Sequence, residues 1–159
     1  MNADTEDNSG VVVLRWGYGP RAVGEARAEL RKALASWGAT AVEDAAILVL
    51  SELLTNAQRY GRVPGRDVET RFLRLAGDGG EGVRLEVHDA SSLRPRLRRA
   101  APFECEGRGL VLVDGVADRW GVVDRNGPGK AVWAECTARA ADVLEGAAVS
   151  ANDQAEKGS

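Results

Sequence analysis

Residues 41–60, AVEDAAILVLSELLTNAQRY, form the longest patterned stretch of the chain and decide the fold. Apolar residues recur in it at three- and four-residue spacing, which predicts a long α-helix that buries one face. Thr40 precedes the stretch and Glu43 follows three residues later, as in a capping box, while Gly61 stands directly after Tyr60. We therefore expect the helix to be capped by Thr40 and to end at Gly61.

Two polar side chains interrupt the apolar face of this predicted helix. Each residue advances by about 100°, so Asn56 shares a stripe with Val49, and Glu52 stands one turn before Asn56 at the edge of the face. Burying an unpaired amide costs about 1–3 kcal/mol, and burying a carboxylate costs more. One interpretation is a structural hydrogen bond to a neighbouring strand. The other is a pocket in which the amide oxygen binds magnesium and the carboxylate is a general base.

The pattern around this helix predicts one domain over residues 11–140, with a disordered tail at 1–10 and a flexible tail at 141–159. Helical spacing predicts two further helices, at 20–37 and 110–117. Short β-rich or alternating runs predict strands at 11–14, 68–75, 83–88, 120–123 and 131–135. Helices followed by strands mainly in hairpins favour a two-layer α/β (α+β) sandwich, in which helices cover one face of a mixed, mostly antiparallel sheet.

Composition narrows the class of protein. The chain has 159 residues, of which 44% are hydrophobic, and a formal net charge of −3. It therefore has no electrostatic reason to bind nucleic acid or an anionic membrane, and we expect neither partner. The start of the chain is acidic and shows no targeting pattern, so we expect a cytoplasmic protein with Cys105 and Cys136 reduced.

Two shorter motifs follow the long helix. Asp89-Ala90-Ser91 ends a predicted strand, where a carboxylate can accept a hydrogen bond from a purine amino group. The alternative is an Asp that starts a turn or caps the next segment. Residues 107–109, Gly-Arg-Gly, directly precede a predicted helix, whose free N–H groups and positive dipole end suit phosphate. The alternative there is a simple tight loop.

In this order and spacing, the motifs resemble the ATP-binding boxes of the GHKL superfamily, which includes gyrase and the histidine kinases. Residues 52–57 (ELLTNA) resemble its asparagine box, 89–95 (DASSLRP) its first ATP box, and 107–113 (GRGLVLV) its second glycine box. Residues 118–122 (DRWGV) and 129–135 (GKAVWAE) resemble the closing strands of anti-sigma-factor serine kinases of actinobacteria.

The resemblance implies a Bergerat-type fold that binds ATP and Mg²⁺ between its helices and its sheet. It implies that Asn56 holds the magnesium ion, that Asp89 reads the adenine amino group, and that Glu52 takes the proton from an attacking serine hydroxyl. The residues that it assigns to ATP are Asn56, Asp89, Ser91, Gly107, Arg108, Gly109, Leu110 and Lys130.

The implied function is a regulatory serine kinase that phosphorylates an anti-sigma-factor antagonist, binds a sigma factor, or both, with a homodimer as the usual assembly. One departure stands out: Cys105 occupies a position where the best-known kinases of this kind have an Arg near the terminal phosphate. An ATP-binding module without catalysis is therefore the alternative. The arginine cluster of the expected ATP lid either is solvated, replaces that cation or docks an acidic partner; it comprises Arg94, Arg96, Arg98 and Arg99.

Overall fold

The computed structural model describes residues 10–76, 81–91, 108–124 and 129–138. Within them, five strands form one sheet in the spatial order β1-β2-β3-β5-β4, and every neighbouring pair is antiparallel. The strands are β1 (Val11–Trp16), β2 (Val68–Leu75), β3 (Gly82–Asp89), β4 (Arg119–Asp124) and β5 (Lys130–Thr137). The expected tails at 1–10 (apart from Gly10) and 141–159, the arginine cluster, Cys105 and Gly107 lie outside the described residues.

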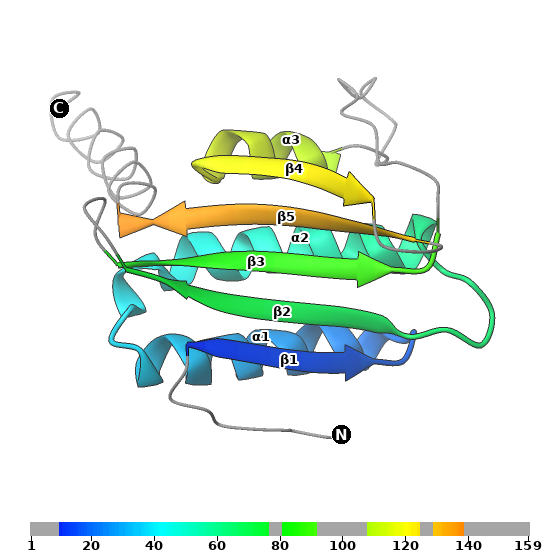
Figure 1. The fold of residues 1–159 in the computed structure, drawn as a ribbon, viewed down its shortest axis with the longest axis horizontal. Coiled ribbons are helices and arrows are strands. Elements are labelled where there is room, and N and C mark those ends of the chain that lie inside the picture. Colours follow the sequence, from blue (N-terminus) through cyan, green and yellow to red (C-terminus); the bar gives the residue numbers. More distant parts are fainter. Residues whose placement is uncertain (1–9, 77–80, 92–107, 125–128, 139–159) are drawn as a thin grey trace, which may run out of the picture.

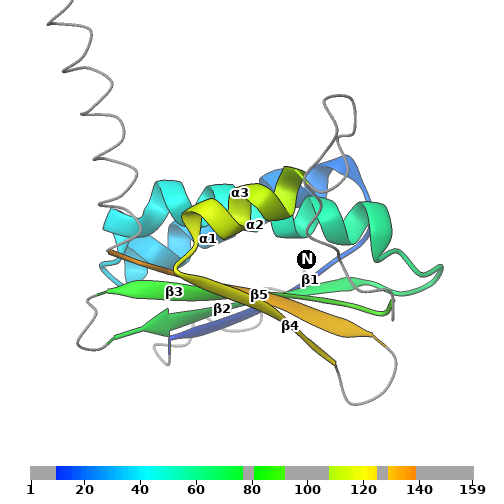
Figure 2. The ribbon, with the colours of Figure 1, turned by 90° about the horizontal axis from the view of Figure 1, so that it is seen from above.

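Three α-helices cover one face of this sheet, as Figure 2 shows. They are α1 (Pro20–Ser36), α2 (Glu43–Tyr60) and α3 (Arg108–Val116). The two-layer α/β sandwich with helices on one face is thereby confirmed. None of the helices in the described ranges combines the length and the apolar character that crossing a membrane would require.

The predicted capping box at the start of the long helix is wrong. Thr40 opens a short 3₁₀ turn, η1 (Thr40–Val42), and α2 begins only at Glu43, with Val42 in the N-cap position. Neither start has a side-chain cap hydrogen bond. Glu43 instead lies in the first turn of α2, where a negative charge interacts favourably with the helix dipole.

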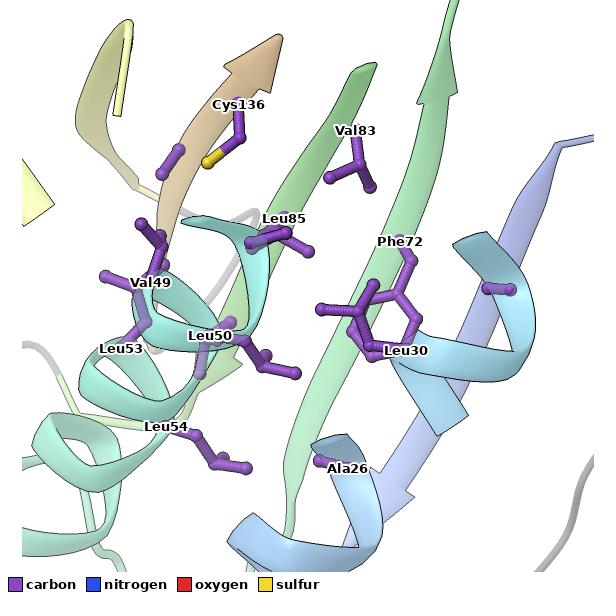
Figure 3. Close-up of a cluster of buried hydrophobic side chains, with 14 of the residues drawn as sticks. Ala26, Leu30, Val49, Leu50, Leu53, Leu54, Phe72, Val83, Leu85 and Cys136 are labelled. Atoms are coloured by element: carbon purple, nitrogen blue, oxygen red, sulfur yellow. The ribbon is translucent and has the colours of Figure 1, made fainter. Parts of the chain in front are cut away.

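The core lies between the helices and the inner face of the sheet. Figure 3 shows Leu30 of α1, Leu50 of α2 and Phe72 of β2 pointing into this layer, and all three are fully buried. Side chains of this size each stabilise the fold by about 1.5–3 kcal/mol on burial. Because α2 packs against both β3 and β5, its position is fixed over the middle of the sheet.

Cys136 belongs to this core, at 0% exposure on the inner face of β5. Burial, together with the nearby charge of Asp118, raises the pKa of its thiol to about 12. The thiolate is the reactive form, so at neutral pH we expect Cys136 to react with a thiol reagent only when the core opens. In a Cys105→Ser variant, colour development with dithionitrobenzoate should be slow in buffer and immediate in denaturant. Immediate reaction of the folded variant would contradict this burial.

Candidate functional site

The candidate residues gather at one end of the sandwich. β3 ends at Asp89 and β5 begins at Lys130, and these two residues are register partners on neighbouring strands. The C-terminal end of α2 and the N-terminal start of α3 lie at the same end, on the right of Figure 1. The fold therefore brings together motifs that lie far apart in the sequence.

Asp89 is held in a buried ion pair. The Nζ atom of Lys130 lies 3.0 Å from its Oδ1 atom, and the two side chains are only 5% and 1% exposed. The backbone N–H of Ser91 donates to the same Oδ1 atom at 2.9 Å, and Lys130 also donates to the carbonyl oxygen of Ser91 at 3.3 Å. The turn that the sequence offered as the alternative for Asp89 is thus present. It orients the carboxylate and does not compete with a role in binding.

Two glycines lie against Asp89, one beside its carboxylate and one beside its backbone. Gly61 follows α2, and a Cβ atom there would lie 2.6 Å from Cγ of Asp89 and still closer to its Oδ2 atom. Gly129 has φ +113°, and a Cβ atom there would collide with the backbone carbonyl oxygen of Asp89. The sequence identified Gly61 only as the end of a helix. Its φ of −99° is open to any residue, so the closeness of Asp89, together with the Ala57 carbonyl oxygen at 2.8 Å, is what excludes a side chain.

The loop between β1 and α1 ties down the end of α2. The Tyr18 hydroxyl donates to the carbonyl oxygen of Gly61 at 3.0 Å, and the Gln58 amide donates to the carbonyl oxygen of Gly19 at 3.0 Å. Burial and the negative charge of Asp89 raise the pKa of the Tyr18 hydroxyl. These contacts hold Gly61 against the carboxylate, and no sequence motif pointed to them.

Glu52 and Asn56 lie one turn apart on α2, and both side chains are partly exposed. Ala45 and Val49, on the same side of α2 nearer its start, are fully buried. The burial of this side of the helix therefore ends before Asn56, which is seven residues after Val49 and so on the same side, but is partly exposed. In the part of the chain that the structure describes, neither the Glu52 side chain nor the Asn56 side chain has a hydrogen-bond or ion-pair partner. Among the described strands, none forms the hydrogen bond to Asn56 or Glu52 that the structural interpretation required.

The third motif meets the start of α3. The helix begins at Arg108, two residues before the predicted start, so Gly109 lies in its first turn. The first four N–H groups of a helix have no intrahelical acceptor and lie at its positive end. Leu110 is 1% exposed, so only its backbone N–H remains for a ligand.

These residues fit a magnesium nucleotide. The Asn56 oxygen, unpaired within the described ranges, is a suitable Mg²⁺ ligand, and the start of α3 suits phosphate. No group of three or more His, Cys, Asp or Glu among the described residues is placed to hold a metal. A magnesium ion would thus depend on Asn56 together with phosphate oxygens and water. When bound, it would neutralise charge on the phosphates.

Comparison with known proteins agrees with this geometry. The family model described as the histidine kinase-like ATPase domain matches residues 19–136. The match begins just before α1, ends within β5, and includes Glu52, Asn56, Asp89 and Lys130. No curated protein matches the chain.

Proposed function

Because the chain belongs to the histidine kinase-like ATPase domain family, we propose that it binds Mg²⁺–ATP and acts as a cytoplasmic serine kinase in a partner-switching pathway. Its protein substrate would be an anti-sigma-factor antagonist, and a sigma factor would be an alternative partner. The observation that supports nucleotide binding best is that three elements reach the same end of the sandwich: β3, which ends at Asp89, the C-terminal part of α2, which contains Asn56, and the start of α3.

The chain's own residues divide the work in this proposal. The Asp89 carboxylate, an acceptor, receives a hydrogen bond from the adenine amino group. Asn56 binds the magnesium ion, and the N–H groups at the start of α3 receive phosphate oxygens. Glu52, partly exposed and one turn from Asn56, accepts the proton of a serine hydroxyl that a docked partner presents.

The second candidate is an ATP-binding module without phosphoryl transfer. Cys105 favours it, because a cation near the terminal phosphate is missing from that position of the sequence. Incubation with labelled ATP and candidate antagonist proteins separates the two candidates. Labelled antagonist supports the kinase, whereas ATP binding without transfer to any of them supports the module.

The nucleotide-binding part of the proposal is tested at Asn56. Replacing Asn56 with alanine removes the amide oxygen and should weaken Mg²⁺–ATP binding by about ten- to a hundredfold, the usual effect of losing one charge-assisted contact. Affinity for ATP without magnesium should change little. Isothermal titration of both proteins with ATP, with and without Mg²⁺, measures this.

A matched control keeps the metal ligand at this position. The Asn56→Asp variant retains an oxygen of the same reach and should keep magnesium-dependent binding. If the wild type and Asn56→Ala bind Mg²⁺–ATP with equal affinity, Asn56 is not the magnesium ligand.

A further inference from the structure

Among the described residues, Lys130 is the only buried lysine or arginine. Its ammonium is committed to Oδ1 of Asp89 and to the carbonyl oxygen of Ser91. Taking an ammonium and a carboxylate out of water costs free energy that their attraction largely offsets, so a buried pair stabilises a fold little compared with apolar residues of the same volume. The pair lies at the end of the inner sheet face, just beyond the apolar residues Val87 and Val132.

A lysine in a nucleotide site commonly binds phosphate directly. The Lys130 ammonium instead donates to the Asp89 carboxylate. We propose that Lys130 is a positioning residue that acts through Asp89 and sets the preference of the site for adenine over guanine nucleotides. The inference rests on the proposed function, because it takes Asp89 as the contact to the base. It adds a residue that determines specificity.

The chemistry of the two purines makes the orientation and charge of Asp89 decisive. Adenine presents an amino donor at the position where guanine presents a carbonyl acceptor. A carboxylate can only accept hydrogen bonds, so it pairs with the adenine amino group and repels the guanine carbonyl oxygen. Lys130 compensates the charge of the carboxylate, and together with the Ser91 N–H it fixes one of its oxygens.

Without the ammonium, the buried carboxylate would lose the positive charge that lies 3.0 Å from its Oδ1 atom, and a charge in this buried place would be less stable. It would then take up a proton or turn away from its present direction. A protonated carboxyl group can donate a hydrogen bond to the guanine carbonyl oxygen. A carboxylate that has turned away forms no hydrogen bond with either base. Either change reduces the discrimination between adenine and guanine. It alters the contact to the base and leaves the contacts to the phosphates as they are.

The test measures dissociation constants of ATP, GTP and adenosine for the full chain by isothermal titration, with Mg²⁺ for the two triphosphates. Lys130→Met removes the charge at similar length, and Lys130→Arg keeps it. We expect the ratio of the GTP to the ATP dissociation constant to fall at least about tenfold in Lys130→Met and to be largely kept in Lys130→Arg. A direct phosphate contact instead predicts equal losses for ATP and GTP with no loss for adenosine, and that result would overturn the inference.

A double-variant comparison keeps the test decisive if Lys130→Met is poorly folded, which circular dichroism would show. Asp89→Asn and Asp89→Asn/Lys130→Met both lack the buried carboxylate, and the second also lacks the charged partner. If Lys130 acts through Asp89, both variants have the same ATP-to-GTP ratio; a further change from Lys130→Met in this background would overturn the inference. Wild-type protein that binds neither nucleotide would reject the proposed function and the inference together. An unchanged ratio in Lys130→Met, with ATP still bound, would reject the inference alone.

Discussion

Changing Glu52 to glutamine should lower the rate of phosphoryl transfer to a protein serine by roughly 10²–10⁴-fold and leave the affinity for ATP unchanged. Glutamine has the same size but cannot take the proton of the hydroxyl. Glu52 is partly exposed and, within the described ranges, has no partner, so the substitution should not unfold the protein. Transfer of labelled γ-phosphate to a candidate antagonist at saturating Mg²⁺–ATP measures the rate.

A control on the same helix separates the role of Glu52 from a general effect of charge. Glu43 is also partly buried, but it lies in the first turn of α2, at the opposite end from Asn56. Glu43→Gln weakens only its interaction with the helix dipole, worth about 0.3–1 kcal/mol of stability, and should leave transfer unchanged. If Glu52→Gln transfers phosphate as fast as the wild type, Glu52 is not the base.

Much of the fold could be predicted because hydrophobic periodicity is a local property. The alternation in residues 68–75 gave the bounds of β2 as the structure has them. The predicted start of α2 was wrong because hydrophobic periodicity does not distinguish one 3₁₀ turn from the first turn of an α-helix. In the structure the Ala39 N–H donates to the carbonyl oxygen of Leu34, and Ala39 is fully buried, so tertiary packing decides the path of the chain there.

The candidate site was predicted only where a residue breaks a local pattern. Asn56 interrupts an apolar helix face and Asp89 ends a strand, so both were visible in the sequence. The ion pair between Asp89 and Lys130 was not, because its partners are 41 residues apart and meet only through the register of β3 and β5. The contact of Gly61 with Asp89 was missed for the same reason, since a glycine after a helix already has an ordinary explanation.

Replacing Gly61 with alanine should weaken ATP binding by about tenfold or more and lower the melting temperature by several degrees. The new methyl group would lie 2.6 Å from Cγ of Asp89 and 2.8 Å from the carbonyl oxygen of Ala57, so something must move. Overpacking of this kind costs about 1–3 kcal/mol, and if the Asp89 carboxylate is what moves, it no longer meets the base correctly. Titration calorimetry with ATP and a thermal melt measure both effects.

Gly24→Ala is the matched control. A Cβ atom at Gly24 in α1 meets nothing within 4 Å, and alanine is the better helix former by about 1 kcal/mol. This variant should bind ATP as the wild type does and melt at the same or a higher temperature. ATP affinity of Gly61→Ala equal to that of the wild type would show that the contact with Asp89 does not matter for binding.

Adenosine shows which part of the structure yields in Gly61→Ala. If the Asp89 side chain turns away, adenosine and ATP should lose affinity by the same factor, because only the base contact is damaged. If the end of α2 lifts instead, Asn56 moves with it and Mg²⁺–ATP should lose more than adenosine. We expect the first result, because turning the Asp89 side chain breaks only its own contacts with Lys130 and the Ser91 N–H. Lifting the end of α2 would move backbone and break the hydrogen bonds of Tyr18 and Gln58 that tie it to the loop before α1.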